Sequence, residues 1–235
     1  MDIPTALITG ASRGLGRALA TELNGRGWRV VADGRDADRL ATTVAALPNP
    51  YLVTAIPGDV ADAAHRRALA TAVGERLHLL VNNASDLGPS PLPRLADLAP
   101  DRFTQILIVN TVAPLALLQE LLPALDRARG RVLGISSDAA VEAYEGWGGY
   151  GASKAALDQL TAVLAVERPE LRIYAVDPGD MATDMHQAAF PDEDISDRPA
   201  PETVVPALLR LVTGELPSGR YRAAELAPAD AEAGA

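Results

Sequence analysis

Short apolar runs alternate with longer helical patterns along most of the chain. The apolar runs have the length and the Val, Ile and Leu content of buried strands, and they cover residues 5–9, 29–35, 51–56, 77–81, 130–135 and 172–176. Helical patterns lie between them, over residues 17–23, 37–47, 61–76, 100–129 and the run that follows Tyr150. This alternation predicts a parallel sheet with helices on both faces, which is the doubly wound α/β class.

Length and composition fit a single domain of this class. The chain has 235 residues, 48% of them hydrophobic, which is enough for one α/β core across residues 1–235. Its end, residues 223–235, is an acidic and alanine-rich tail. Cysteine is absent from the sequence, and the three histidines lack the spacing of metal ligands. We therefore expect no disulfide, no thiol nucleophile and no metal site.

The formal net charge of -10 limits the class of partner. An acidic protein repels nucleic acid and anionic membrane surfaces, and an acidic carrier protein is disfavoured for the same reason. The N-terminal residues lack the basic start and apolar core of a signal peptide. The most apolar region, 103–125, is interrupted by polar residues and proline, unlike a membrane span. We expect a soluble cytoplasmic protein.

Three glycines follow the first apolar run and open the first helical pattern. Gly10, Gly14 and Gly16 have the spacing G-x-x-x-G-x-G, which differs from the G-x-G-x-x-G of many dinucleotide sites. Glycines in such a turn let backbone N–H groups approach a phosphate, and the start of a helix adds partial positive charge. Their position between strand and helix predicts a Rossmann-type dinucleotide site.

The end of the second apolar run is where the adenosine ribose is expected. If Gly34 faces the 2′-hydroxyl, no acidic side chain repels a 2′-phosphate there, and Arg35 with Arg13 could clamp that phosphate. A shift of one residue would place Asp33 against the ribose and favour NAD(H) instead. The sequence favours NADP(H) and leaves NAD(H) open.

Tyr150 and Lys154 lie four residues apart, followed by a run of good helix formers. One helical turn would place the phenol beside the ammonium group, and a nearby positive charge lowers the pKa of a tyrosine. Lys154 is also the only lysine among the 21 Lys and Arg residues, so the chain uses Arg at its other cationic positions. The pair predicts a proton donor and acceptor that works near neutral pH.

These motifs resemble the short-chain dehydrogenase/reductase family over about residues 5–222. The matching segments occur in the family's order, and they are Thr9 to Gly16, Asp59, Asn82 to Ala84, Asn110, Ser137, Tyr150 with Lys154, Pro178 with Gly179, and Thr183. Ser137 lies thirteen residues before Tyr150, as in the family. The resemblance implies the same fold, a single-domain Rossmann-type parallel sheet.

The resemblance also implies roles for four catalytic residues. Tyr150 would give or take the substrate proton, and Lys154 would lower its pKa and hold the nicotinamide ribose. Ser137 would hydrogen-bond the carbonyl oxygen, and Asn110 would fix a water that links Lys154 to solvent. The implied cofactor contacts are Gly10, Ser12, Arg13, Gly14, Leu15, Gly16, Arg35, Asp59, Val60, Asn82, Ala84, Tyr150, Lys154, Pro178, Gly179 and Thr183.

The activity that the resemblance implies is hydride transfer between NADP(H) and a small ketone or secondary alcohol. The alternative is a non-catalytic nucleotide-binding regulatory protein on the same fold. An epimerase or dehydratase of the extended family fits the short chain and the glycine spacing less well. Ser85 departs from the glycine usual in the family and would add a side chain beside the nicotinamide. The region after Gly214 lacks the usual glycine pair of the family, so a homodimer is possible as well as a homotetramer.

Three loops are expected to line the substrate site, residues 85–93, 138–149 and 180–200, the last as a lid. They carry Tyr144, Trp147 and Phe190 in a chain that is only 4% aromatic. This cluster either favours an apolar or cyclic ketone over an anionic one, or simply packs the loops.

Overall fold

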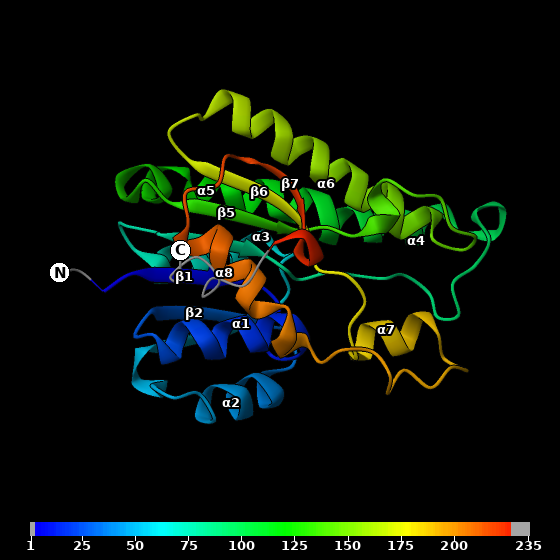
Figure 1. Cartoon of the computed structure of the whole chain (residues 1–235), viewed down its shortest axis with the longest axis horizontal. Helices are drawn as coiled ribbons and strands as arrows, with labels where there is room; N and C mark the ends of the chain where they lie inside the picture. The colour runs from blue at the N-terminus through cyan, green and yellow to red at the C-terminus, as the bar shows by residue number, and fades with distance from the viewer. Residues whose placement is uncertain (1–2, 227–235) are drawn as a thin grey trace, which may run out of the picture.

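The centre of the computed structural model, which describes residues 3–226, is a seven-stranded sheet (Figure 1). Its strands are β1 (Thr5–Ile8), β2 (Arg29–Gly34), β3 (Val53–Pro57), β4 (Leu79–Asn82), β5 (Arg131–Ile135), β6 (Arg172–Asp177) and β7 (Gly219–Arg222). They lie in the order β3-β2-β1-β4-β5-β6-β7, and each neighbouring pair is parallel. The predicted doubly wound parallel sheet is confirmed.

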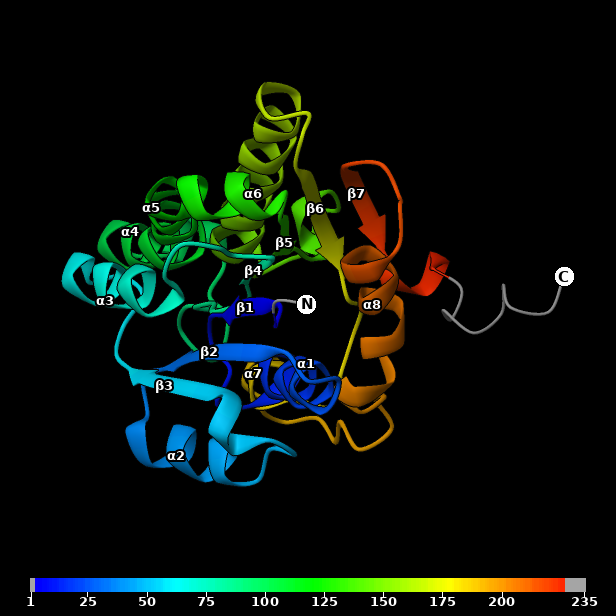
Figure 2. The same ribbon diagram turned by 90° about the vertical axis from the view of Figure 1, so that its left-hand side faces the viewer.

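Helices cover both faces of this sheet (Figure 2). On one face lie α1 (Gly14–Gly25), α2 (Ala37–Ala45) and α8 (Val205–Thr213), and on the other lie α3 (Ala63–Val73), α5 (Ala113–Ala128) and α6 (Gly148–Glu167). Leu19 of α1 and Leu208 of α8 belong to one buried core, whereas Leu69 of α3 and Leu117 of α5 belong to the other. The central strands β1 and β4 are buried along their whole length because both of their faces are covered.

The helical pattern predicted over residues 100–129 is not one continuous α-helix. A π-helical turn at Ile108–Val112 separates α4 (Pro100–Leu107) from α5, and Asn110 lies buried in this turn. Among the described residues, Pro100–Ala128 is the one stretch long and apolar enough to cross a membrane, a test that core helices of soluble proteins also pass. Here Leu117 and Leu121 pack into the core beside the sheet.

Three C-terminal elements were not predicted from the sequence. The helix α7 (Asp184–Ala189) has only six residues, and β7 has the polar sequence Gly-Arg-Tyr-Arg, so neither gives a clear periodic signal. The third is α8. Short 3₁₀ helices complete the structure at Pro50–Leu52, Leu95–Asp97, Asp138–Ala140, Pro201–Thr203 and Ala223–Glu225. The predicted tail lies outside the described residues from residue 227 onward.

The strand order places a ligand crevice at a defined point. From β1 the chain builds outward to β2 and β3, and from β4 it builds in the opposite direction to β7. Ligands of open α/β sheets bind beyond the carboxyl ends of the strands at such a reversal, because the flanking helices leave on opposite faces. Figure 1 shows α7 beyond these carboxyl ends, at the far side of the molecule from the N-terminus.

Candidate active site

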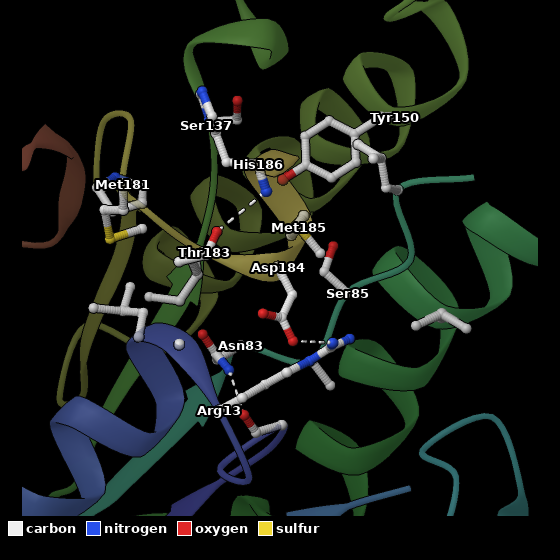
Figure 3. A pocket seen from close by; sticks show the side chains of 18 of the residues that line it. Arg13, Asn83, Ser85, Ser137, Tyr150, Met181, Thr183, Asp184, Met185 and His186 are labelled. Carbon is white, nitrogen blue, oxygen red and sulfur yellow. Dashed lines mark hydrogen bonds and ion pairs between the residues drawn. The ribbon is translucent and has the colours of Figure 1, made fainter. Parts of the chain in front are cut away.

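A cavity of about 780 Å³ lies at the carboxyl ends of the strands (Figure 3). Its volume is in the range of small-molecule and cofactor sites. One part, which we name the nucleotide end, is lined from the glycine turn, the β2–α2 connection and residues 58–60. The other part, the chemical end, is lined by Ser137, Tyr150 and Lys154 with their neighbours.

The glycine turn has a backbone that only glycine adopts readily. Gly10 and Gly14 line the cavity with φ values of +67° and +53°. The helix α1 begins at Gly14 without a side-chain cap, so its first N–H groups can bind an anion. Gly16 does not line the cavity. A Cβ there would lie 2.4 Å from the carbonyl oxygen of Gly10, so this glycine lets α1 pack against the turn.

The residues at the end of β2 face in different directions. The side chain of Asp33 is buried at the edge of the cavity, and its Oδ1 lies 3.4 Å from Nε2 of His65 on α3. Gly34 faces the glycine turn, since a Cβ there would lie 3.0 Å from the Ser12 side chain. Arg35 lines the cavity, and its guanidinium makes no hydrogen bond or ion pair with any described residue. Gly34 therefore presents no side chain to the glycine turn, whereas the carboxylate of Asp33 accepts a backbone hydrogen bond from Gly10 of that turn.

Of the side chains predicted on the adenine side, one lies behind the cavity. Asp59, Val60 and Ala84 line it, as does Leu15 in the glycine turn. The side chain of Asn82 is buried beside a void of about 10 Å³ behind it.

Asn83, and not Asn82, contributes its side chain to this part of the cavity. Asn83 lines the cavity, and its Nδ2 donates to the carbonyl oxygens of Thr9 at 2.8 Å and Gly10 at 3.2 Å. Neighbouring side chains at the end of a strand point to opposite sides, which explains the shift of one residue.

Two arginines of the nucleotide end share one carboxylate oxygen. Nη1 of Arg13 and Nη1 of Arg39 each lie 2.8 Å from Oδ2 of Asp184, the first residue of α7. These two donors hold the pKa of Asp184 below its usual value. Sequence reasoning missed Arg39 and Asp184. Arg39 lies four residues after Arg35, and this helical spacing could have indicated that both arginines lie on one side. No sequence signal relates Asp184 to the arginines.

The chemical end brings together three of the four predicted catalytic residues. Tyr150 and Lys154 lie one turn apart on α6, as their spacing predicts, and Ser137 follows β5. Nζ of Lys154 donates to the carbonyl oxygen of Ile135 at 2.8 Å and lies 5.4 Å from the centroid of the Tyr150 ring. Oγ of Ser137 donates to Oδ1 of Asp138 at 2.9 Å.

The pKa values of this pair differ from the sequence expectation. Burial raises the pKa of Tyr150 well above its usual value, a hydrogen bond with Ser85 opposes the rise, and the charges of Asp138 and Asp177 add to it. Burial likewise lowers the pKa of Lys154 to about 8. The expected lowering of the tyrosine pKa by Lys154 is therefore wrong for the polypeptide by itself. Both groups are almost fully buried, and desolvation disfavours the charged form of each.

Asn110 lies beneath the chemical end and does not line the cavity. Its Nδ2 donates to the carbonyl oxygen of Asp86 and to Oγ of Ser153, both at 2.9 Å. Its Oδ1 accepts from the backbone N–H of Asp86 at 2.7 Å and from Oγ of Ser85 at 3.2 Å. The amide has then used both N–H groups and both lone pairs. Its side chain joins the turn after β4 to α6 and has no group left for the predicted water.

The loops expected around the substrate contribute an aromatic and acidic wall. The ring of Trp147 lies 5.6 Å from that of Tyr150 and 5.9 Å from that of Phe190, between centroids. Oη of Tyr144 lies 2.8 Å from Oε2 of Glu142 and 3.0 Å from Oδ2 of Asp138. The aromatic cluster thus lines the cavity as well as packing the loops.

The segment after β6 connects the two ends of the cavity. Pro178, Gly179 and Thr183, which are predicted cofactor contacts, line it, and Thr183 caps α7 by accepting the N–H of His186 at 3.2 Å. His186 also lines the cavity and was not predicted, nor were Leu87, Met181 and Met185. In residues 3–226 no cluster of three His, Cys, Asp or Glu side chains could hold a metal ion.

Together, the parallel sheet, the glycine turn and the buried tyrosine–lysine pair place the protein in the class of dinucleotide-dependent oxidoreductases. Residues 4–194 match the model of the short chain dehydrogenases, and the chain belongs to that family. The family acts on small-molecule carbonyl or alcohol substrates with a nicotinamide dinucleotide. The comparisons give no support to the alternative of a non-catalytic nucleotide-binding protein.

Individual relatives differ in what they act on. The chain is similar to the rhamnolipids biosynthesis 3-oxoacyl-[acyl-carrier-protein] reductase of Pseudomonas aeruginosa, with 37% identity over 74% of this chain and 71% of the relative. It is also similar to the sepiapterin reductase of Xenopus laevis, with 31% identity over 78% of this chain and 75% of the relative. A solved structure from Escherichia coli CFT073, complexed with NADPH, matches with a TM-score of 0.87 and 28% identity, covering 95% and 97% of the two chains.

Proposed function

We propose that the protein is an NADP(H)-dependent carbonyl reductase, or an alcohol dehydrogenase in the reverse direction, with Tyr150 as the proton donor and acceptor. One observation carries the proposal: Ser137, Tyr150 and Lys154 line one end of the cavity whose other end is lined by Arg13, Arg35 and Arg39. The first group suits carbonyl chemistry, and the second suits a phosphate on the adenosine ribose.

The residues of the nucleotide end fit NADP(H) better than NAD(H). Gly34 presents no side chain toward the glycine turn, and the carboxylate of Asp33 is engaged by His65 and by the backbone of Gly10. The guanidinium of Arg35 is free of protein partners among the described residues, so it can bind a 2′-phosphate bidentately. The uncapped start of α1 would hold the pyrophosphate. The NADPH complex of the Escherichia coli relative agrees with this preference.

Each residue of the chemical end has a defined task in the proposed reaction. When bound, NADPH supplies the hydride that reduces the carbonyl carbon. Ser137 orients the substrate by donating a hydrogen bond from its hydroxyl to the carbonyl oxygen, in place of the hydrogen bond to Asp138. Oη of Tyr150 then gives its proton to that oxygen, and the raised pKa of the phenol keeps the donor protonated at neutral pH. The ammonium of Lys154 stabilises the phenolate that remains.

The chemical end fits a neutral substrate with an apolar or cyclic body. Trp147 and Phe190 provide aromatic walls, and Asp138 places a carboxylate beside Ser137. Apart from the buried Lys154, the Lys and Arg side chains that line the described cavity belong to the nucleotide end. A substrate carboxylate or phosphate would therefore meet Asp138 without a compensating cation. We propose that free ketones are preferred over acyl groups on an acidic carrier.

A cofactor-monitored assay with ketones and secondary alcohols tests the activity, and Tyr150→Phe tests the mechanism. Removing the phenolic hydroxyl leaves the carbonyl oxygen without its proton donor, so we expect kcat to fall by about 10²- to 10⁴-fold. The dissociation constant of NADPH, measured by fluorescence titration, should stay nearly unchanged. Full activity of the variant would refute the role of Tyr150, and a wild-type protein that binds no nicotinamide dinucleotide would refute the function.

A further inference from the structure

The carboxylate of Asp184 occupies a place between two guanidinium groups of the nucleotide end. Arg13 extends from the glycine turn and Arg39 from the first turn of α2, and both Nη1 atoms lie 2.8 Å from the single oxygen Oδ2. Figure 3 shows the Asp184 side chain directed at Arg13 across the cavity. Two converging guanidinium groups form a site for one anion, and in this structure the anion is a side chain of α7.

A more highly charged anion can displace the Asp184 carboxylate from the two arginines. The side chains of Arg13, Arg39 and Asp184 are each about half exposed, at 50%, 47% and 56%. Ion pairs at this exposure contribute little free energy and are screened by salt. A phosphate monoester carries more charge than a carboxylate and offers three acceptor oxygens, so it binds a pair of arginines more strongly.

The helix that carries Asp184 also forms part of the chemical end. Met185, His186 and Phe190, from α7 and the residue after it, line the cavity, and Phe190 packs on Trp147 with ring centroids 5.9 Å apart. On its other side α7 is held by Oγ of Ser90, which donates to the carbonyl oxygen of Ala188 at 2.7 Å. A change at Asp184 is therefore transmitted through one short helix to the wall of the substrate site.

We propose that Asp184 is an internal competitor of the cofactor's 2′-phosphate for Arg13 and Arg39, and that NADP(H) binding releases α7 from the nucleotide end. The inference rests on the proposed use of NADP(H) and adds a selectivity residue to it. Asp184 weakens NADP(H) relative to NAD(H), because only the former must displace the carboxylate. The release of α7 also changes the wall of the chemical end, so the chemical end differs between the states with and without a 2′-phosphorylated cofactor.

The first test measures nucleotide binding without turnover. The probes are adenosine 2′,5′-bisphosphate and adenosine 5′-phosphate, titrated by calorimetry into wild type and into Asp184→Asn, which keeps the side-chain shape and removes the charge. We expect the bisphosphate to bind the variant about three- to tenfold more tightly than wild type, and the monophosphate to change by less than about twofold. An unchanged or lowered preference for the bisphosphate would overturn the proposal.

Asp197→Asn is the matched control. It removes one negative charge from the same segment, but Asp197 pairs with Arg198 and does not line the cavity. It should leave the binding of both probes unchanged. A shift as large as that of Asp184→Asn would mean that overall charge, and not displacement of Asp184, causes the effect, and this too would overturn the proposal.

The second test uses the wild-type protein and so does not depend on the folding of a variant. Hydrogen exchange of the backbone amides in residues 184–190 is followed by mass spectrometry with each probe. We expect the bisphosphate to accelerate exchange in α7 and the monophosphate to leave it unchanged. Slower exchange with the bisphosphate would show that α7 tightens on the phosphate and would overturn the inference. If wild type binds neither the bisphosphate nor NADPH, the proposed function fails as well.

Discussion

The two ends of the cavity hold their charged groups in opposite ways. At the chemical end, Tyr150 and Lys154 are only 8% and 2% exposed and lie on the twenty-residue helix α6. At the nucleotide end, Arg13 and Arg39 are about half exposed and extend from a turn and from the short helix α2. The charged groups of the chemical end are therefore shielded from water, and those of the nucleotide end are exposed to water and to salt.

This difference decides where each end obtains its effect. Burial at the chemical end shifts the pKa values of Tyr150 and Lys154. Removing a charged group from water costs more free energy than its remaining contacts recover. At the nucleotide end the arginines are exposed, so their ion pairs are weak and one bound anion can readily replace another. Proton transfer thus depends on a few residues whose environment is fixed, whereas cofactor choice depends on the sum of several weak contacts.

The largest effect expected at the nucleotide end comes from Arg35→Asp. The change replaces a free guanidinium with a carboxylate that repels the 2′-phosphate, so NADPH binding should weaken by roughly ten- to a hundredfold, the value of a charge-assisted hydrogen bond. NADH binding should change far less. Fluorescence titration of both dinucleotides measures the ratio.

Arg17→Asp is a suitable control for this variant, because Arg17 lies on α1, carries the same charge and does not line the cavity. Its ratio of NADPH to NADH affinity should stay at the wild-type value. If Arg35→Asp lost equal affinity for NADPH and NADH, then Asp33, or no residue at the end of β2, would distinguish the two cofactors by their ribose.

The next effect in size is the pH dependence of stability that Lys154 imposes. Its folded pKa of about 8 lies below the usual lysine value of 10.5, so between these values the unfolded chain binds more protons and the free energy of unfolding rises with pH. From pH 7 to 9.5 the rise should be about 2 kcal/mol, at 1.36 kcal/mol per pKa unit. Urea unfolding at several pH values should show this rise in wild type and not in Lys154→Met.

The methionine variant also separates two contributions. At pH 7 it should be more stable than wild type, since the burial of the ammonium costs more than its hydrogen bond to Ile135 returns. If both proteins gain stability equally with pH, another group titrates in this range and the pKa of Lys154 is not lowered by the fold.

The tyrosine–lysine pair and six of the seven strands could be predicted because their signals are local. Alternating apolar runs specify the strands, and the four-residue spacing of Tyr150 and Lys154 places both on one face of a helix. The protonation of the pair could not be predicted, because it depends on burial by segments distant in sequence. The shift from Asn82 to Asn83 has a similar cause, since pattern alone does not fix which side of β4 faces the cavity.

Contacts between distant segments were beyond the reach of the sequence. Asp184 meets Arg13 and Arg39 across separations of 171 and 145 residues, and α7 itself is too short to give a helical period. Asn110 illustrates an intermediate case. Its place in an apolar run indicated a buried amide that needs partners, but only the structure identifies them as Asp86, Ser85 and Ser153.

The smallest effect expected at the chemical end comes from Ser85→Ala. Ser85 hydrogen-bonds the phenol and opposes the rise that burial gives to the pKa of Tyr150, so removing its hydroxyl should raise that pKa further. Alcohol oxidation needs the phenolate, and its rate at neutral pH should fall by about two- to fivefold, from a hydrogen bond of up to about 1 kcal/mol. The pH profile of oxidation should move to higher pH, while carbonyl reduction, which needs the protonated phenol, should change little. Equal losses in both directions would instead assign Ser85 to holding Asn110, whose Oδ1 it also contacts at 3.2 Å.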